Sequence, residues 1–278
     1  MLQQLQDIGG LNFMTRIERA FSNKKAFIGF VTAGDPTLEM TKKLVIAMEE
    51  KGADLIELGI PFSDPIAEGP VIQEANKRAL ANGTTTDKIF EMVKELRKTV
   101  KVPLVFLTYL NPIFTYGAER FMRNCKECGV DGVIVPDMPF EERGELKDVS
   151  ERYDVDVISL ITPTSKNRIA MIAREAKGFI YCVSSLGVTG VRKELRMDLG
   201  DMIDVARAHS DLPCAVGFGI STPEQAKAMA SISDGAIVGS AIVRLVAKYG
   251  EDAVGPVGEY VAKMKQAVEK AQQESIAI

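Results

Sequence analysis

A glutamate stands inside a short apolar run of this chain and is followed at once by a loop rich in proline and acidic residues. Residues 57–70 have the sequence ELGIPFSDPIAEGP, in which Glu57 comes first and Glu68 twelfth. The apolar run 53–58 predicts a strand, whose side chains alternate between two faces. Because moving a carboxylate out of water is unfavourable unless it is paired or neutralised, Glu57 indicates either acid–base chemistry or a buried ion pair or hydrogen bond. Both interpretations stay open from this stretch alone.

The other reactive side chains are few. The only histidine, His209, ends a predicted helix ahead of Pro213, where a cation has an ordinary structural role. Ser-His-Asp or Cys-His catalysis would depend on that one residue. Cys125 and Cys128 form a Cys-x-x-Cys pair without a second pair, so a structural zinc site lacks ligands. Their helical pattern favours burial over a redox role. Any acid–base chemistry therefore falls to carboxylates and tyrosines.

Strand-like runs and helical segments alternate along the whole chain. The expected strands are 27–31, 54–58, 104–109, 132–136, 155–160, 179–183, 214–218 and 235–238. The expected helices after them are 36–51, 86–99, 117–128, 141–153, 166–176, 199–209, 223–231 and 240–249. Most strands are continuously apolar, as parallel strands covered on both faces are. Eight such units predict an α/β fold, a (β/α)₈ TIM barrel, as a single domain over residues 1–278. An open doubly wound sheet is the competing fold.

Three further helices do not belong to the eightfold pattern. Residues 12–22 predict an N-terminal helix that closes the bottom of the barrel. Residues 70–81 predict an extra helix after the second strand, with Pro70 at its first position and Gly83 after its end. Residues 259–272 predict a C-terminal helix with a polar face.

Composition and charge bound the class of protein. The chain has 278 residues, of which 46% are hydrophobic, enough for a large core. A formal net charge of -4 gives no basic excess for nucleic acid or an anionic membrane. The sequence has no run of roughly 18 apolar residues for a membrane span and does not start like a signal peptide. We expect a cytoplasmic protein with a small-molecule substrate and no nucleic-acid or membrane partner.

Glycines cluster where the sixth, seventh and eighth expected strands end. They are Gly187, Gly190, Gly217, Gly219 and Gly239. Glycine lets backbone N–H groups approach an anion closely, and the helix that begins after Gly239 has free N–H groups at its start. Each glycine alone is typical of a tight turn. Together, at strand ends where this fold often binds phosphate, they favour a phosphate site.

Neutral side chains lie between the acidic strand end and the glycines. They are Phe30, Leu107, Tyr109, Ile134, Tyr181 and Phe218. Such residues line apolar pockets that suit a flat ring, although core packing is the alternative for each of them. A phosphorylated small molecule with an aromatic ring would fit across the barrel mouth.

Five segments in this order resemble the signature stretches of the tryptophan synthase alpha chain family. They are FVTAGDP (30–36), ELGIPFSDP (57–65), GVTG (187–190), GFGIS (217–221) and GSAIV (239–243), so the resemblance spans about Phe27 to Val243. It implies a lyase of tryptophan biosynthesis that cleaves indole-3-glycerol phosphate to indole and glyceraldehyde 3-phosphate. The resemblance further implies that this retro-aldol reaction uses no cofactor or metal in this chain.

The resemblance also implies the catalytic groups. Glu57 matches the glutamate that protonates the indole ring at C3 and helps to deprotonate the glycerol hydroxyl, and burial would suit its pKa to this exchange. Tyr181 matches the tyrosine near that hydroxyl. Glu68 stands where the family has an aspartate beside the indole N–H. Because a misplacement of about 1 Å can lower a rate on the order of 10²-fold, either the loop absorbs the extra methylene or the rate is lower.

Binding residues and a partner follow from the same resemblance. The indole pocket is implied at Phe30, Leu107, Tyr109, Ile134 and Ile237, and the phosphate site at Gly190, Phe218, Gly219, Gly239 and Ser240. Thr189 resembles the lid contact to the catalytic loop. The implied partner is a beta chain, the only subunit with pyridoxal phosphate, in an α₂β₂ heterotetramer that contacts this chain near Asp64, Asp137 and Pro139.

Two other functions stay open. A different phosphosugar barrel enzyme would usually need a lysine or a second acid pair at the strand ends, and these strand ends contain no lysine. A weakly active subunit that mainly activates a beta chain is suggested only by Glu68. The apolar residues of the loops around Asp64 and Asp137 are consistent either with docking or with ordinary loop hydrophobes.

Overall fold

Eight parallel strands form one closed barrel in the computed structural model, which describes residues 14–184 and 198–276. The strands are β1 (Ala26–Thr32), β2 (Leu55–Gly59), β3 (Leu104–Leu107), β4 (Gly132–Ile134), β5 (Asp156–Ile161), β6 (Ile180–Val183), β7 (Cys214–Gly217) and β8 (Gly235–Val238). They follow one another around the barrel in chain order, and β1 pairs with β8 to close it. The predicted TIM barrel is confirmed, and the open doubly wound sheet is wrong.

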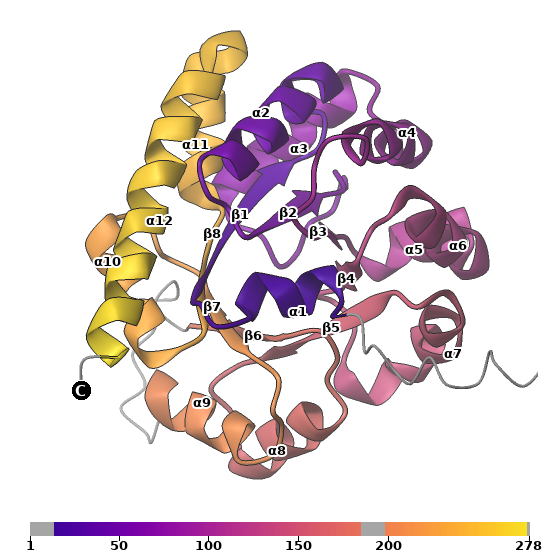
Figure 1. The fold of residues 1–278 in the computed structure, drawn as a ribbon. Coiled ribbons are helices and arrows are strands. Elements are labelled where there is room, and N and C mark those ends of the chain that lie inside the picture. Colours follow the sequence, from indigo (N-terminus) through magenta and orange to yellow (C-terminus); the bar gives the residue numbers. More distant parts are fainter. Residues whose placement is uncertain (1–13, 185–197, 277–278) are drawn as a thin grey trace, which may run out of the picture.

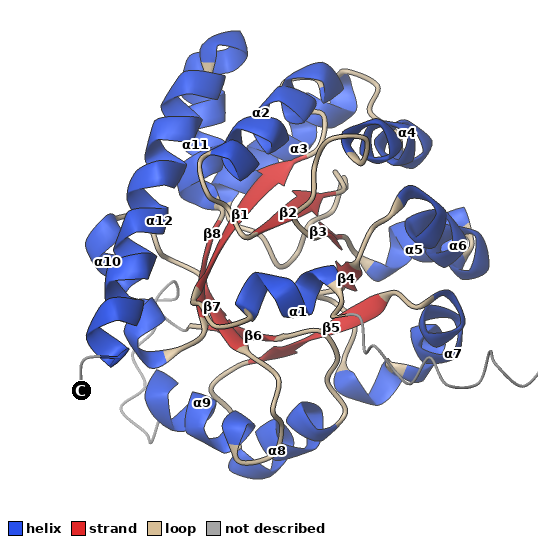
Figure 2. Cartoon of the chain, viewed as in Figure 1, coloured by secondary structure: helices blue, strands red, loops and turns tan. Residues whose placement is uncertain are grey.

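A helix follows each strand and packs on the outside of the barrel (Figures 1 and 2). These helices are α2 (Leu38–Glu50), α4 (Thr86–Leu96), α6 (Ala118–Cys128), α7 (Gly144–Tyr153), α8 (Lys166–Arg174), α9 (Leu199–Arg207), α10 (Pro223–Ile232) and α11 (Ser240–Tyr249). Short 3₁₀ turns, η1 (Phe140–Glu142) and η3 (Gly250–Asp252), precede α7 and follow α11. Thr37, Thr85, Ser165 and Thr222 cap four of the helices by accepting a backbone N–H of the first turn.

The three predicted additional helices are present as α1 (Arg16–Phe21), α3 (Pro70–Ala81) and α12 (Val254–Ile276). The bounds of α3 agree with the prediction. Helix α1 begins later than expected, after a capping box between Thr15 and Glu18, and predicted residues 12 and 13 lie outside the described residues. Helix α12 begins five residues early because Pro256 is compatible with a first helical turn.

A fourth additional helix, α5 (Leu110–Tyr116), was not predicted. The sequence Asn111-Pro112 is typical of a loop, but Pro112 falls in the first turn of α5, where its missing N–H breaks no intrahelical bond. Gly117, with φ of 89°, separates α5 from α6. Strand β3 accordingly ends at Leu107, two residues before the predicted end.

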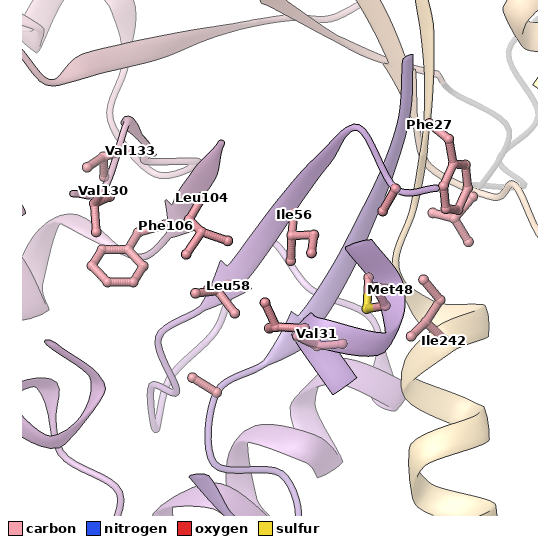
Figure 3. Close-up of a cluster of buried hydrophobic side chains, with 14 of the residues drawn as sticks. Phe27, Val31, Met48, Ile56, Leu58, Leu104, Phe106, Val130, Val133 and Ile242 are labelled. Carbon is pink, nitrogen blue, oxygen red and sulfur yellow. The ribbon is translucent and has the colours of Figure 1, made fainter. Parts of the chain in front are cut away.

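Strand side chains divide between two cores. Ile56 and Leu58 of β2 belong to the outer core between the strands and the surrounding helices, together with Phe27, Val31 and Met48 (Figure 3). The inner core fills the barrel and contains Ile28, Leu55, Val105, Ile134, Ile158, Tyr181, Ala215 and Ile237. Alternation along each strand produces this division.

Helix α1 closes the bottom of the barrel, as predicted. Ile17 and Ala20 are buried in the inner core, and the Phe21 ring packs on Phe179 with centroids 5.6 Å apart. Figure 1 shows α1 lying across the ring of strands. Functional groups are therefore left to the opposite, carboxyl end of the strands.

Aspartates tie neighbouring strands together at the bottom. Asp54, just before β2, accepts the Phe27 N–H at 2.8 Å and forms an ion pair with Lys265 at 2.7 Å. Asp131, just before β4, accepts the Leu104 N–H at 2.9 Å. Asp54 is thus a structural residue outside β2, not its first residue. In the described part of the chain, no helix is both long and apolar enough to cross a membrane.

Candidate active site

Glu57 points into the barrel from the middle of β2. Its neighbours Ile56 and Leu58 face the outer core (Figure 3), so alternation turns the glutamate inward. It lies in register with Phe30 of β1 on one side and Val105 of β3 on the other. The residue is 1% exposed. The predicted acid at the strand end is therefore inside the mouth rather than on the helical side.

Burial leaves the Glu57 carboxyl largely uncompensated. Its Oε1 atom has no hydrogen-bond partner among the described residues. Burial raises the pKa of Glu57 to about 8, from an ordinary value of 4.5. A carboxyl with such a pKa can both donate and accept a proton near neutral pH. The structure favours the acid–base interpretation of Glu57 over a buried ion pair.

Glu57→Gln is expected to stabilise the folded chain at neutral pH. Between pH 4.5 and about 8 the folded chain retains a proton that the unfolded chain releases, so its stability falls as pH rises through this window. Glutamine has no such proton, and its free energy of unfolding at pH 7 should exceed that of the wild type by on the order of 3 kcal/mol. Urea unfolding at pH 5 and pH 7 measures this difference. A variant that is no more stable than the wild type at pH 7 would contradict the raised pKa.

Tyr181 of β6 faces the same interior space. It belongs to the inner core, burial raises its pKa well above the ordinary value, and the Glu57 charge raises the pKa further. Its ring lies against Gly217 of β7: a Cβ at that position would come within 2.3 Å of the Tyr181 hydroxyl. Only glycine at 217 leaves room for the phenol. The structure thus brings Tyr181 and Glu57 together, as the sequence predicted.

Glu68 lies in the loop between β2 and α3 and is half-buried. Burial raises the pKa of its carboxyl to about 7, and a hydrogen bond from Asn76 acts in the opposite direction. The Asn76 Nδ2 atom donates to Glu68 Oε2 at 2.7 Å. The sequence analysis missed Asn76. The available signal was an asparagine at 76 within a helix face that also contains Ala75 and Ala79, all three of them buried.

Tyr109 links this loop to the next strand. It follows β3 as the N-cap of α5, not as a strand residue. Its hydroxyl accepts the Ala67 N–H at 3.0 Å, and its ring packs on Phe62 with centroids 5.2 Å apart. Burial raises the Tyr109 pKa, and the charge of Glu68 adds to the effect. Tyr109 and Glu68 are therefore neighbours at the mouth.

The remaining predicted pocket side chains form the walls around Glu57. Phe30 packs with Leu107, Ala75 and Val243 in one small cluster. Leu107 also contacts the inner core, which contains the buried residues Ile134 and Ile237. These residues supply an apolar wall from β1, β3, β4 and β8. Their burial agrees with the pocket and with ordinary core packing alike.

The end of β7 has an unusual backbone. Phe218 and Gly219 have φ values of 85° and 76°. A bulky residue with positive φ is rare and occurs mostly at functional sites. The Ser184 hydroxyl donates to the Phe218 carbonyl at 2.9 Å. Phe218 is 45% exposed in the part of the chain that the structure describes, so its place in the apolar slot stays a prediction. The predicted strand end at 218 is one residue too long.

The start of α11 offers free donors beside this turn. Gly239 is the N-cap and has no side chain to cap the helix, and Ser240 is the first helical residue. The N–H groups of such a turn are available to an anion. Strands β7 and β8 are paired, so their carboxyl ends are adjacent. The predicted Gly190 and the lid residue Thr189 lie outside the described residues.

The predicted partner residues lie on loops at the carboxyl end of the strands. Asp64 is exposed in the β2 loop and accepts the Ser63 hydroxyl at 2.5 Å. Asp137, after β4, accepts the Leu110 N–H at 2.9 Å, and Pro139 is exposed. Ile66, in the same loop as Asp64, is 83% exposed. A single exposed isoleucine is also common in ordinary surface loops, so both interpretations of these loops stay open.

The Cys-x-x-Cys pair and the histidine lie in surroundings typical of structural residues. Cys125 is buried in α6 and Cys128 half-buried, and burial raises the pKa of both thiols. The favoured interpretation, a buried helix face, is confirmed for Cys125. His209 lies just beyond α9, with Nδ1 2.9 Å from the Val205 carbonyl oxygen. Within the described ranges, no group of three or more metal-binding side chains is close enough to hold an ion.

A closed parallel barrel with a buried acid in its mouth and a glycine-containing turn after β7 on the same rim is typical of a TIM-barrel enzyme of acid–base type. Residues 18–273 match the profile of the family described as tryptophan synthase alpha chain. The alpha chain of Lacticaseibacillus casei is 47% identical over 263 residues, which are 95% of this chain and 99% of the relative. That of Geobacillus stearothermophilus is 50% identical over 235 residues, 84% and 87% of the two chains.

Solved structures agree with the sequence relatives. The tryptophan synthase alpha chain of Legionella pneumophila superposes with a TM-score of 0.83 at 38% identity, covering 92% of this chain and 98% of that one. A chain of the tryptophan synthase α₂β₂ complex from Pyrococcus furiosus superposes with a TM-score of 0.79 at 36% identity, covering 87% and 98%. This chain belongs to the tryptophan synthase alpha chain family, and it is a lyase.

Proposed function

We propose that this chain cleaves indole-3-glycerol phosphate to indole and glyceraldehyde 3-phosphate, a step of tryptophan biosynthesis. Family membership supports the reaction. The observation that supports the mechanism is the inward carboxyl of Glu57, whose Oε1 has no hydrogen-bond partner among the described residues and whose pKa burial raises to about 8. The reaction is a retro-aldol cleavage that the side chains of this protein perform without a cofactor or metal.

Glu57 acts first as an acid and then as a base. Its neutral carboxyl donates a proton to C3 of the indole ring, which places a positive charge on the ring nitrogen. The resulting carboxylate takes the proton of the glycerol hydroxyl next to the ring. The carbon–carbon bond then breaks, its electron pair restores the aromatic indole, and the hydroxyl carbon becomes the aldehyde. A pKa of about 8 suits a group that must do both near neutral pH.

Glu68 and Tyr181 assist at the two ends of the breaking bond. In its ionised form Glu68 faces the ring N–H and stabilises the positive charge that develops there. Tyr181, deep in the barrel beside Glu57, donates its hydroxyl hydrogen bond to the glycerol oxygen. Because burial raises the pKa of Tyr181, its phenol stays protonated as a donor.

The ring and the phosphate fix the substrate. The indole lies between the walls formed by Phe30, Leu107, Tyr109, Ile134 and Ile237. The phosphate binds the N–H groups at the start of α11 and the turn of Phe218 and Gly219, beside Ser240. The resemblance to the family assigns Gly190 to the phosphate contacts and Thr189 to a lid, and both residues lie outside the described part of the chain.

Gly219→Asp is expected to raise KM by about 10- to 100-fold. The new carboxylate would repel the substrate phosphate and would disrupt the hydrogen bonds that backbone N–H groups donate to it. Gly219 has a φ of 76°, so any side chain there adds backbone strain. Gly219→Ala is the matched control, since it has the strain without the charge. Steady-state kinetics of both variants separate the two effects. Equal KM values for Gly219→Asp and Gly219→Ala would count against the phosphate site.

The chain is proposed to work as the alpha subunit of a cytoplasmic α₂β₂ heterotetramer. The alpha chain from Pyrococcus furiosus is part of such a complex, and its similarity supports the same assembly here. The loops with Asp64, Asp137 and Pro139, together with exposed Ile66, form the proposed contact surface. Indole would pass to the beta subunit, which alone would hold pyridoxal phosphate.

The proposed function is tested by indole release from indole-3-glycerol phosphate by the purified chain, alone and with a beta chain. The expected result is indole and glyceraldehyde 3-phosphate in equal amounts, formed faster when the beta chain is present. Activation of a beta chain without indole release would identify a regulatory subunit instead.

A further inference from the structure

Asn76 contacts Glu68 from a neighbouring helix and has no role in the mechanism above. It lies in α3, the additional helix after β2, and its side chain is 3% exposed. Its amide donates a 2.7 Å hydrogen bond to one carboxylate oxygen of Glu68. A buried amide that meets a carboxylate at the barrel mouth constrains where that carboxylate points.

We propose that Asn76 is a positioning residue: its amide holds the Glu68 carboxylate in the orientation in which the carboxylate faces the substrate ring nitrogen. The inference rests on the proposed function of Glu68. Glutamate has three rotatable side-chain bonds, so a free Glu68 on a loop would adopt many orientations. The hydrogen bond engages Oε2, and the proposal assigns Oε1 to the substrate.

Helix α3 is a fixed platform for this contact. Two turns away from the loop, Arg78 forms a bidentate ion pair with Asp35, with both N···O distances at 2.8 Å. Asp35 is buried in the middle of the loop after β1. The buried residues Ala75 and Ala79 seat the same helix on the barrel. Helix α3, and Asn76 with it, is therefore anchored to β1 and the loop that follows it.

The Glu68 backbone is held separately from its carboxylate. The Gln73 side-chain amide, also on α3, donates to the Glu68 carbonyl at 2.8 Å. The Tyr109 hydroxyl accepts the N–H of the preceding residue, Ala67. Removal of Asn76 would free the carboxylate while the loop backbone keeps its own contacts. Gln73 thus provides a matched control on the same helix.

The contact also affects the charge of Glu68. Burial favours the neutral acid, whereas the Asn76 hydrogen bond favours the carboxylate. Other titratable groups near this site are the Tyr109 phenol, which the Glu68 charge affects directly, and Asp137, which acts on that same phenol. Because the proposed reaction needs the carboxylate, Asn76 serves both its orientation and its ionisation.

Asn76→Ala tests the inference in two measurements. In a ¹³C NMR titration of the free chain, the Glu68 pKa should rise by about one pH unit, as expected for loss of a hydrogen bond to a charged group. In the cleavage assay kcat should fall by about 10-fold at pH 7, and the ratio of variant to wild-type rate should increase with pH. Gln73→Ala should leave both the pKa and this ratio nearly unchanged.

If the alanine variant does not fold, the nearly isosteric Asn76→Asp replaces it in both measurements. Its carboxylate beside Glu68 should raise the Glu68 pKa above that of the wild type, because like charges disfavour ionisation. An unchanged Glu68 pKa in the Asn76 variants, or equal and pH-independent losses in the Asn76 and Gln73 variants, would overturn the inference. The NMR titration needs no substrate, so its outcome is independent of the indole assay. A wild-type chain that releases no indole would overturn the proposed function, not the hydrogen bond between Asn76 and Glu68.

Discussion

Glu57→Gln should lose indole release almost completely while the chain stays folded. Acid–base catalysis by one side chain typically contributes about 10²- to 10⁴-fold, and we expect the upper part of this range because Glu57 both donates and accepts the proton. Glutamine keeps the shape of the side chain in the barrel but cannot exchange a proton. Steady-state cleavage of indole-3-glycerol phosphate measures the loss in kcat.

The stability of Glu57→Gln serves as the control for its loss of activity. Because Glu57→Gln removes a group that destabilises the folded chain at neutral pH, reduced activity cannot be attributed to unfolding if its denaturation midpoint rises. Binding of glyceraldehyde 3-phosphate should stay within about 2-fold of the wild type, since the phosphate turn at Phe218 and Gly219 is far along the barrel rim from β2. Near-normal turnover by Glu57→Gln would remove the proposed mechanism.

Glu68→Ala should lower kcat by about 10²- to 10³-fold, a loss typical of removing one group that stabilises transition-state charge. Its carboxylate is the second acidic group that the structure places at the mouth, next to Tyr109 and Asn76. Glu68→Asp should keep or raise activity, because the charge is retained and the loop can adjust to one methylene. Parallel steady-state assays of the wild type, Glu68→Ala and Glu68→Asp compare their kcat values.

The pH dependence separates the two carboxylates. Glu57 must start protonated and has a pKa of about 8, so its contribution should decline as pH rises through that value. Glu68 must be ionised and has a pKa of about 7, so its contribution should decline as pH falls through that value. Glu68→Ala should therefore lose the acid limb of the rate profile and keep the alkaline limb. Normal cleavage by Glu68→Ala would show that the second carboxylate has no role.

Much of the barrel could be predicted because its signals are local. Continuous apolar runs marked the strands, and Pro70 with Gly83 fixed the bounds of α3. Glu57 was predictable for a similar reason, since a carboxylate within an apolar strand stands out without any tertiary information. Helix α5 was missed because Asn111-Pro112 is locally a loop sequence, and only the structure shows that Pro112 falls in a first turn.

Contacts between segments could not be predicted in the same way. Asn76 is eight residues from Glu68, and their hydrogen bond depends on the path of the β2 loop. The positive φ of Phe218 likewise depends on the turn after β7, which leaves this residue 45% exposed. Local sequence specifies which elements form; the loops that join them decide which side chains meet.

The central claim is that Glu57 is a protonated acid at neutral pH inside the folded barrel. Infrared difference spectra of the wild type minus Glu57→Gln, recorded from pH 6 to pH 9, test it most directly. We predict a protonated carboxyl band at pH 6 that titrates near pH 8 and belongs to Glu57 alone. A carboxylate band already present at pH 6, with no change up to pH 9, would contradict the account.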